Sequence, residues 1–467
     1  MSPSSPGPTL IPIASPSLEV LKQRRQRLSD VFTDPVLLWS GNASARNFPA
    51  NVYPFRANSH FLYFVGYPLQ NAVVYLEGGR LTLYMDNPSA ASALWHGPEP
   101  EREAIAHHIG ASAAFPLADL PLRAQDAATV LAQDGPTQQH QGSVLGRSVV
   151  AAPQAEGLDR ELAIAISQIR LCHDAAGLEE MRHAAAVTVK AHQAGMRATP
   201  TASHESDVRA AMERVILAQN MTTAYSSIVT VQGEVLHNNH YHHRLSPGDL
   251  LLADVGAETA SGWAADITRT WPVSGTFSPS QRSLYAIVLA AHDACIAEIK
   301  PGVEYREIHL LAAQIMAEGL VDLGILRGNP MDLVEQDAHA LFFPHGVGHL
   351  LGLDVHDMED LGDMAGYAPG RQRSDRFGLS YLRLDRPLQP NMVVTIEPGF
   401  YQVPGILQNP DWRSRYQTLV NWDRLAEFAD VRGIRIEDDV RVTETGHEVL
   451  TAALPTAIAD IEALMNG

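Results

Sequence analysis

Residues 250–270 read LLLADVGAETASGWAADITRT, which is two apolar runs that each end in an aspartate. The first run has the length of a buried strand and leads into Asp254, and the second leads into Asp266 as the return arm of a hairpin. A carboxylate within an apolar strand is costly to bury unless it is paired, protonated or bound to a metal. The stretch therefore predicts antiparallel strands that carry a chemical site.

Three more ionisable side chains stand in comparable segments of the second half of the chain. They are His349 in HGVGHLLGLDVHD, Glu397 in MVVTIEPG and Glu437 in GIRIEDDV. Any one of the carboxylates alone is better interpreted as a solvated or salt-bridged strand end. Four carboxylates and one imidazole together match the ligands that two divalent ions need, and oxygen-rich ligation favours Mn²⁺ while tolerating Co²⁺ or Zn²⁺.

Composition narrows the possible partners and compartments. The chain has 467 residues, enough for two or three domains, and a net charge of −19. That charge disfavours nucleic acids and anionic membranes as partners. Two cysteines cannot form a disulfide framework, no stretch approaches the roughly 20 apolar residues of a membrane span, and the N-terminus lacks the pattern of a secretory signal. We therefore expect a cytoplasmic protein.

Patterning divides the chain into three parts. Residues 1–15, rich in proline and serine, are expected to be flexible. Residues 16–170 predict an α/β domain, with a helix near 18–27 and with the strands VLLWS, FLYFVGY, AVVYLEG and RLTLYMD. Residues 171–467 start with a helix capped by Asp174, and their helices alternate with antiparallel strands, which is typical of an α+β fold.

These segments resemble, in order and wording, the pita-bread metallopeptidase family of Xaa-Pro aminopeptidases and prolidases. The likeness rests on D-x-G-x-E, D-I-T-R-T, H-G-x-G-H, E-P-G and R-I-E-D-D, which follow one another here as they do in the family. It is strongest from Tyr225 onwards and extends more weakly to YPFRANSHFLYFVGY and ALWHGP. The resemblance implies a creatinase-like α/β domain at 16–170, followed by a pita-bread catalytic domain at 171–467.

By this resemblance the five groups divide between two metal ions. Asp254 would chelate one ion, His349 and Glu397 would hold the other, and Asp266 and Glu437 would bridge the two. A hydroxide shared by the ions would attack the peptide bond, and Glu397 would handle the proton of that water. One departure from the family is the spacing of twelve positions between Asp254 and Asp266, where eleven is usual. An extra residue in the connecting turn would keep both carboxylates facing inward.

Three further histidines match family residues that act at the site. By resemblance, His237 and His356 contact the substrate and the tetrahedral intermediate, and both count as catalytic and substrate-binding residues. His345 resembles a residue that supports the site from behind the metal ligands and borders the substrate. The chain has 20 histidines, so most of them are surface or structural groups. That interpretation is favoured for the cluster of His240, His242 and His243.

Two arginines and a tryptophan bear on substrate binding. Arg435, two positions before Glu437, shares the face of its strand and is expected to order carboxylate ligands or to meet a substrate carboxylate. Arg383 lies in an insertion that resembles prolidases, where the matching arginine binds the free carboxylate of a dipeptide; a solvated surface arginine is the alternative. Trp95 resembles a tryptophan that reaches the active site, in some relatives from a neighbouring subunit, and a buried core position is the alternative.

The predicted function is hydrolysis of the Xaa-Pro bond, with Xaa-Pro dipeptides preferred because the insertion around Arg383 and the long segment 400–432 resemble prolidases. Aminopeptidase P, which acts on longer peptides, is the nearest alternative. Some pita-bread proteins are binding modules that lost their ligands, and creatinase works without metal; a complete ligand set disfavours both. Methionine aminopeptidase usually lacks an N-terminal domain of this length. Relatives of these kinds are commonly homodimers or homotetramers.

Overall fold

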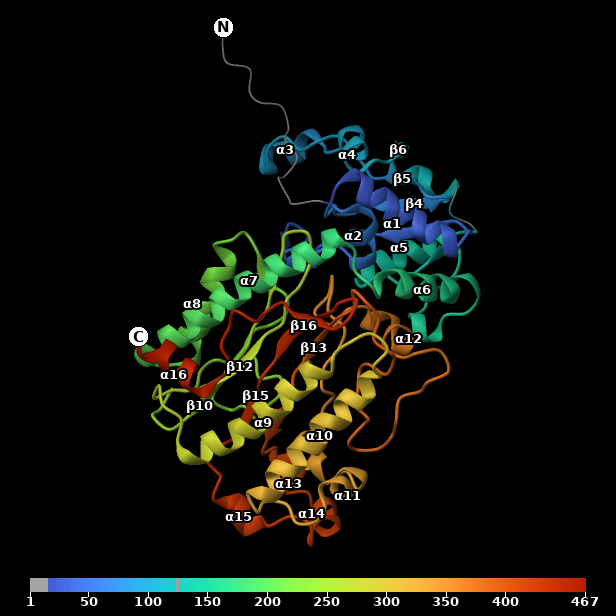
Figure 1. The fold of residues 1–467 in the computed structure, drawn as a ribbon. Helices are drawn as coiled ribbons and strands as arrows, with labels where there is room; N and C mark the ends of the chain where they lie inside the picture. Colours follow the sequence, from blue (N-terminus) through green and yellow to red (C-terminus); the bar gives the residue numbers. More distant parts are fainter. Residues whose placement is uncertain (1–15, 123, 125) are drawn as a thin grey trace. The chain divides into compact units, whose positions relative to one another are not determined.

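The computed structural model describes residues 16–122, 124 and 126–467, so the predicted flexible segment 1–15 lies outside the described residues. The chain forms two compact units (Figure 1). Unit 1 comprises the chain up to Leu171 together with two short later segments, 260–262 and 358–365. Unit 2 comprises the rest of the chain, which is residues 172–259, 263–357 and 366–467.

Unit 1 is built on a five-stranded sheet with the order β6 (Ala113–Phe115), β5 (Arg80–Tyr84), β4 (Val73–Glu77), β1 (Val36–Trp39) and β7 (Ala128–Thr129). The strands β1, β4 and β5 are antiparallel neighbours, whereas β7 runs parallel to β1 and β6 runs parallel to β5. Leu37, Trp39 and Tyr84 belong to the apolar core of this unit. Its other elements are a hairpin of β2 (Ala45–Phe48) and β3 (Asn51–Val52) and the helices α1 (Leu18–Val31), α2 (Ser59–Val65), α3 (Ala90–His96), α4 (Arg102–Ile109), α5 (Gly135–Leu145) and α6 (Gly157–Arg170).

One element of unit 1 differs in type from the sequence prediction. The segment FLYFVGY, predicted as a strand, forms most of the helix α2 and the turn after it. The Asn58 side chain caps this helix by accepting from the N–H groups of His60 and Phe61, and Gly66 ends it in the left-handed conformation with a φ of 70°. Every residue of α2 is buried, so its sequence has no polar face and no helical periodicity.

The strands of unit 2 form several small antiparallel sheets. The β10–β12 pairing places Asp254 opposite Thr268. Asp266 therefore lies just before the return strand, which is shorter than the predicted arm over 262–273. The strands are β8 (Thr222–Thr223), β9 (Ile228–Thr230), β10 (Leu250–Asp254), β11 (Ala257–Glu258), β12 (Thr268–Pro272), β13 (Val393–Ile396), β14 (Gly399–Tyr401), β15 (Gly433–Arg435), β16 (Asp438–Val442) and β17 (His447–Val449).

A second pair of strands in unit 2 places the two glutamates. In the sheet β13-β16-β17, Ile396 pairs with Asp438, so that Glu397 follows one strand and Glu437 precedes its neighbour. An isolated bridge between Thr268 and Glu437 joins this sheet to the sheet β12-β10-β9. The ends of four strands therefore meet where the sequence predicts carboxylate ligands.

Helices lie on both sides of these strands (Figure 1). In contact with the strands, α7 (Ala175–Ala198) packs on β11, α8 (Glu205–Leu217) packs on β9, and α9 (Pro279–Glu298) packs on β13, β14 and β15. The predicted cap of α7 is confirmed, because the Asp174 side chain accepts from the N–H of Gly177. In the described part of the chain, no helix has the length and hydropathy to cross a membrane. The other helices are α10 (Tyr305–Asp322), α11 (Pro330–Glu335), α12 (Asp363–Gly366), α13 (Pro404–Leu407), α14 (Pro410–Arg415), α15 (Trp422–Ala426) and α16 (Ile458–Asn466).

Candidate metal centre

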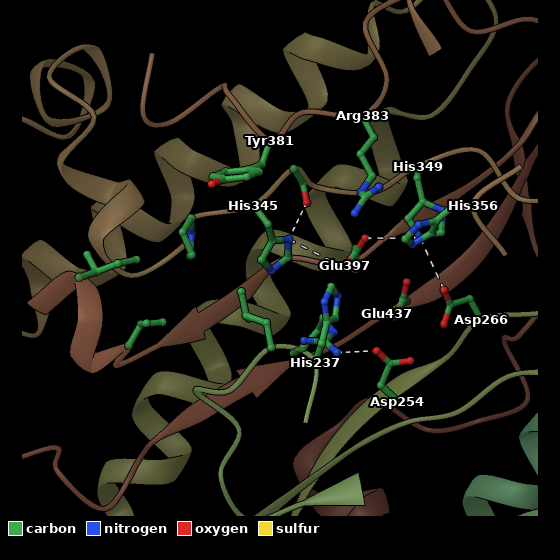
Figure 2. A pocket seen from close by; sticks show the side chains of 16 residues that line it. His237, Asp254, Asp266, His345, His349, His356, Tyr381, Arg383, Glu397 and Glu437 are labelled. Carbon is green, nitrogen blue, oxygen red and sulfur yellow. Dashed lines mark hydrogen bonds and ion pairs between the residues drawn. The ribbon is translucent and has the colours of Figure 1, made fainter. Parts of the chain in front are cut away.

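One pocket of unit 2 gathers all five predicted ligands together with the predicted histidines and arginines (Figure 2). Its charged side chains gather on one side, and aliphatic side chains complete the wall. The lining residues are Leu236, His237, Asp254, Asp266, Pro344, His345, Gly346, His349, His356, Tyr381, Arg383, Glu397, Val403, Ile406, Arg435 and Glu437. The structure thus brings together side chains that are up to two hundred positions apart in the sequence.

The two aspartates of the β10–β12 hairpin meet at one tyrosine hydroxyl. The Tyr225 hydroxyl lies 2.5 Å from Oδ1 of Asp254 and within hydrogen-bond reach of Oδ1 of Asp266. A hydroxyl has one proton to donate, so it can donate to only one of the two carboxylates at a time. Both aspartates line the pocket although twelve positions separate them, so the extra residue is accommodated between the two strands.

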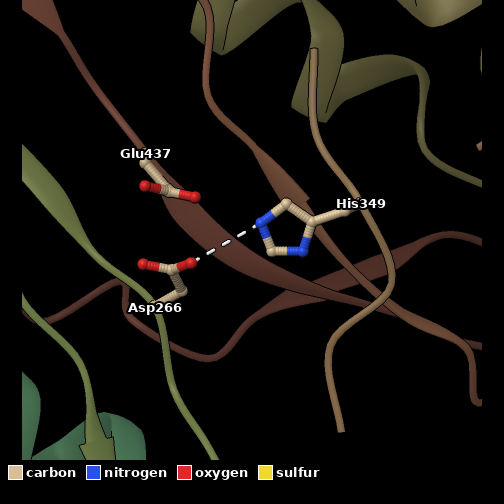
Figure 3. Close-up of side chains that lie close together, drawn as sticks. All are labelled: Asp266, His349 and Glu437. Atoms are coloured by element: carbon tan, nitrogen blue, oxygen red, sulfur yellow. Dashed lines mark ion pairs between the residues drawn. The ribbon is translucent and has the colours of Figure 1, made fainter. Parts of the chain in front are cut away.

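A second group of side chains lies around His349 (Figure 3). Its Nε2 atom is 3.5 Å from Oδ2 of Asp266 and 3.6 Å from Oε1 of Glu397. Its Nδ1 atom is 3.0 Å from the carbonyl oxygen of Leu350, which can only accept, so Nδ1 carries a proton. Asp266, His349 and Glu437 each offer one ligand atom, and these three atoms lie within 4.8 Å of one another.

The carboxylates of this cluster disfavour one another's charge. Burial, and then the charge of Asp254, raises the pKa of Asp266 well above its usual value. Burial, followed by the charges of Asp266 and Glu397, raises the pKa of Glu437 in the same way, and burial raises the pKa of Glu397 to about 7. Among the described residues, Oε1 of Glu437 has no hydrogen-bond partner although it is buried.

These residues fit a centre for divalent metal ions. A cation between the carboxylates would compensate the charges that burial and mutual repulsion disfavour. It would also give Oε1 of Glu437 a partner. A metal-binding histidine commonly donates its second ring N–H to a carbonyl, as His349 does to Leu350. Oxygen ligands with a single imidazole suit hard or borderline ions.

The motifs D-I-T-R-T and R-I-E-D-D hold each other in place by hydrogen bonds. The Thr268 hydroxyl donates to Oε2 of Glu437 at 2.6 Å and accepts from Nε of Arg435 at 3.0 Å. The backbone N–H of Asp266 donates to the carboxylate of Asp439 at 3.2 Å. The segment of Asp266 therefore helps to position Glu437, and the segment of Glu437 helps to position Asp266.

A buried ion pair lies behind the same two motifs. Nη2 of Arg269 is 2.9 and 3.0 Å from the two carboxylate oxygens of Asp438, and Nη1 donates to the carbonyl oxygen of Glu437 at 2.6 Å. Nε2 of His292, on α9, is 3.0 Å from Asp438. Burial alone would raise the pKa of Asp438, but the charge of Arg269 holds it below its usual range. Asp438 is therefore an anion in the interior of the unit.

The three predicted histidines have different surroundings. Nε2 of His345 lies 2.9 Å from the Tyr401 hydroxyl, and its Nδ1 lies 2.7 Å from a backbone carbonyl. Burial lowers the pKa of His345 to about 3, so this imidazole is neutral. The ring of His356 stands edge-on to that of His349, with 4.2 Å between the centroids. His237 lies at the pocket wall, and partial desolvation lowers its pKa.

The two predicted arginines both line the pocket. Nη2 of Arg435 lies 2.5 Å from Oδ2 of Asp254, and Nη1 lies 3.0 Å from the Tyr401 hydroxyl. Arg435 thus holds a carboxylate of the ligand set, which is one of the two tasks expected of it. Arg383 points into the pocket from the facing loop, next to Tyr381 (Figure 2).

Trp95 and the cluster of histidines after His237 do not line this pocket. Trp95, on α3 of unit 1, is 79% exposed, so the alternative of a buried core position is wrong. It is not among the residues that line the pocket of its own chain. Nδ1 of His243 lies 2.9 Å from the buried carboxylate of Glu205, which is a structural contact.

Models of protein families identify both parts of the chain. The model of metallopeptidase family M24 matches residues 179–444, more than half of the sequence, and the model of the aminopeptidase P N-terminal domain matches residues 21–132. The chain belongs to metallopeptidase family M24. It is therefore a metallopeptidase, and the predicted α+β fold, with a creatinase-like domain followed by a pita-bread catalytic domain, is confirmed.

Two curated M24 relatives and one solved structure illustrate the similarity. A probable Xaa-Pro aminopeptidase of Talaromyces marneffei is 31% identical over 89% of this chain and 88% of its own length. An Xaa-Pro dipeptidase of Homo sapiens is 30% identical over 92% of this chain and 88% of its own. The structure of aminopeptidase P from E. coli with the inhibitor Pro-Leu has a TM-score of 0.79 at 27% identity, covering 97% of this chain and 99% of that one.

Several residues of this M24 site are absent from the sequence prediction. Tyr225 and Tyr401 are two of them, because a tyrosine in a half-apolar segment is normally interpreted as a residue of the hydrophobic core. Thr268, Arg269 and Asp438 stand beside predicted ligands, and their polarity within strands was the available signal. The partners of Thr268, Arg269 and Asp438 could not be read from spacing, because these contacts join residues more than 160 positions apart.

Proposed function

We propose that this M24 protein hydrolyses the peptide bond between a residue and the proline that follows it. The observation that carries the proposal is the complete ligand set in one pocket, contributed by Asp254, Asp266, His349, Glu397 and Glu437. The names of the two curated relatives support the substrate class, since one is a probable Xaa-Pro aminopeptidase and the other an Xaa-Pro dipeptidase. A binding module descended from such enzymes would be expected to have lost part of the set.

We assign the five groups to two divalent ions, most readily Mn²⁺, with Co²⁺ or Zn²⁺ tolerated. Asp254 would chelate one ion, His349 and Glu397 would hold the other, and Asp266 and Glu437 would lie between them. Bound ions of this kind supply Lewis-acid activation of water and of the scissile carbonyl. The hydrogen bonds to the carboxylates hold these groups in place before an ion or a substrate arrives.

The other pocket residues would bind substrate and transfer protons. Glu397 would accept the proton of the attacking water and pass it to the leaving nitrogen. His237 and His356 would donate N–H groups to the substrate and to the oxygen that gains charge in the tetrahedral intermediate. Arg435 keeps Asp254 oriented, which is a positioning task.

Substrate length is the finer part of the proposal. In an Xaa-Pro dipeptide the free carboxylate follows directly after proline, and Arg383 could bind both of its oxygens. A longer peptide has a neutral amide at that point. The placement of Arg383 in the pocket, opposite Asp254, supports dipeptides as the preferred substrates. Aminopeptidase P activity on longer peptides is the second candidate, and the name of the Talaromyces relative favours it.

The direct test compares Xaa-Pro with Xaa-Pro-Yaa as substrates of the full chain. The protein is stripped with a chelator and assayed before and after Mn²⁺ is restored. We expect turnover of both substrate types to depend on the metal and kcat/KM to be higher for the dipeptide. Preference for the tripeptide would replace prolidase by aminopeptidase P. No metal-dependent turnover of either substrate would favour a binding module.

The oligomeric state, the cellular location and the absence of nucleic-acid and membrane partners remain predictions. A homodimer or homotetramer is supported by the exposed apolar residues of α3, because Leu94 and Trp95 are 78% and 79% exposed. Light scattering on the purified chain would measure the assembly, and a monomer at micromolar concentration would contradict it. The cytoplasmic location, and the absence of nucleic-acid and membrane partners, would be measured by cell fractionation and binding assays.

A further inference from the structure

The stretch Arg56–His60 of unit 1 has contacts that the proposed chemistry does not use. It belongs to the motif YPFRANSHFLYFVGY and begins the helix α2. Two segments from the second half of the chain, 260–262 and 358–365, belong to the same compact unit. The first lies between Asp254 and Asp266 in the sequence, and the second begins two positions after His356.

His60, which is buried, lies between an arginine and an aspartate in a chain of hydrogen bonds. Nη1 of Arg170 is 2.7 Å from Nδ1 of His60, and Nε2 of His60 is 3.0 Å from Oδ2 of Asp360. A guanidinium can only donate, so Nδ1 must accept and carries no proton. Nε2 therefore holds the proton and donates it to the Asp360 carboxylate. The His60 side chain is 1% exposed, so this bond has little competition from water.

Asp360 is an anion whose charge is stabilised by several neighbouring groups. Burial raises its pKa, but His60 and the charge of Arg170 outweigh that effect and lower the pKa to about 2. The amide of Gln133 donates to the same carboxylate oxygen at 3.4 Å. Three residues from separate parts of unit 1 therefore determine where Asp360 lies.

The chain between His356 and Asp360 is short and has little freedom. The N–H of Asp357 donates to the carbonyl of Leu350 at 3.0 Å. Met358 is buried and has a φ of 61°, in the left-handed region that a residue with a side chain rarely adopts. Such a conformation persists where the surrounding structure imposes it. His356 is thus followed by a segment whose conformation is imposed from both ends.

A second contact of the same stretch reaches the other late segment. Nη2 of Arg56 lies 3.3 Å from the carbonyl oxygen of Gly262, while Nη1 donates to the Ser59 hydroxyl at 2.8 Å. Gly262 lies in the turn whose extra residue lengthens the spacing between Asp254 and Asp266. Both late segments are therefore bound by residues no more than four positions apart in unit 1.

We propose that the chain Arg170–His60–Asp360 is a positioning device that sets the placement of His356 through the short chain segment 357–360. Asp360 and His60 are positioning residues, since they act through His356 and touch neither substrate nor metal ligands. The inference rests on the proposed function in one respect, the role of His356 in binding substrate. Loss of the Asp360 contact would free the segment 357–360 and allow His356 to leave its productive position.

The test removes the charge of Asp360 and compares the effect on kcat with the effect of the same substitution at a nearby aspartate. Asp360→Asn lowers kcat for an Xaa-Pro substrate by at least about tenfold, because small displacements of a positioned group cost that much. Its metal content stays within error of the wild type, whereas Tm falls because the charge of Asp360 stabilises the folded state. Asp363→Asn, the same change three positions later, leaves kcat within about twofold, because the His60 contact is made by Asp360 and stays intact.

A double variant shows whether Asp360 acts through His356. In the background His356→Ala, the change Asp360→Asn should lower kcat by less than about twofold, because the group that it positions is already absent. The exchanged pair His60→Asp with Asp360→His, in which the aspartate accepts from both Arg170 and the histidine, should recover part of the lost rate. Equal losses in both backgrounds, or a near-normal rate in Asp360→Asn, would overturn the proposal.

A measurement without substrate separates this proposal from the proposed function. Hydrogen exchange of the amides at 354–358 should be faster in Asp360→Asn than in the wild type, and unchanged in Asp363→Asn. If the wild type shows no Xaa-Pro turnover, the proposed function is wrong. The hydrogen-exchange measurement then tests the positioning device by itself. If the wild type is active but exchange at 354–358 is the same in all three proteins, the positioning device is wrong and the proposed function stands.

Discussion

At the scale of single residues, Arg435 and Arg383 are the same type of side chain but have different roles because their surroundings differ. Arg435 is 4% exposed and already paired with Asp254 and the Tyr401 hydroxyl, so its charge serves the ligand set. Arg383 lies across the pocket on a loop that also presents Tyr381, which is 62% exposed. Arg383 is therefore better placed to meet a carboxylate that arrives with the substrate.

We predict that Arg383→Ala lowers kcat/KM for Xaa-Pro dipeptides by at least about thirtyfold, since a lost charge-assisted contact to a carboxylate costs about 2–4 kcal/mol. Hydrolysis of Xaa-Pro-Yaa should change by less than about fivefold, because the neutral amide there gains little from the arginine. Arg386→Ala, in the same loop but outside the pocket lining, is the control. Equal losses for both substrates would remove Arg383 as the basis of dipeptide preference.

The ligand candidates could be predicted from the sequence because a carboxylate at the end of an apolar strand is conspicuous. Asp254 and Glu397 are examples, and the structure places both in one pocket. Tyr225, which contacts two predicted ligands, was not predictable in this way. Its position depends on how segments pack, and a tyrosine in an apolar segment is far more often core than a partner of a carboxylate.

At the scale of elements, the strands β12 and β16 are joined by the buried ion pair of Arg269 with Asp438. Breaking a buried pair leaves an uncompensated charge, which typically costs about 3–5 kcal/mol. Arg269→Met should therefore lower Tm strongly and, by displacing Glu437, reduce the bound metal. The control is Arg424→Met, whose exposed pair with Glu427 contributes about 1 kcal/mol at most. Differential scanning calorimetry with elemental analysis would measure both effects, and equal Tm values for the two variants would contradict the prediction.

The strand β17 is tied to the helix α7 by a pair that depends on pH. Arg182 donates to the Glu448 carboxylate, and this bond lowers the pKa of Glu448 to about 2. A depressed pKa stabilises the folded state fully above the unfolded value, and the contribution is lost as pH falls towards 2. Glu448→Gln should therefore lower Tm at pH 7, and the free energy of unfolding should fall by about 1 kcal/mol or less because the pair is partly exposed. The difference should narrow between pH 5 and pH 3, and a constant difference would contradict this origin.

Elements with regular periodicity or clear caps could be predicted from the sequence, as α7 with its Asp174 cap shows. The helix α2 could not, because burial on all sides removes the polar face on which helical periodicity depends. The membership of 260–262 and 358–365 in unit 1 was equally hidden. It follows from contacts such as that of His60 with Asp360, which join residues 300 positions apart.

At the scale of the whole molecule, the pocket links metal binding to stability. Buried carboxylates that share one site repel each other without a cation, and the raised pKa values of Asp266 and Glu437 reflect this. The metal-free protein should therefore melt at a lower temperature than the loaded protein. Added Mn²⁺ should raise Tm with concentration, because the folded state alone has the assembled site. A melting curve that is indifferent to both chelator and Mn²⁺ would favour a binding module with vestigial ligands.

Two ions per chain, held by five side chains, are the feature on which the proposed function depends most. The direct measurement is elemental analysis of the chelated protein after equilibration with Mn²⁺, together with turnover of an Xaa-Pro substrate. We predict about two ions per chain in the wild type. In Asp266→Ala and in Glu437→Ala we predict about one ion or none, with turnover lowered at least about a hundredfold. Two bound ions and near-normal turnover in either variant would contradict the dinuclear site.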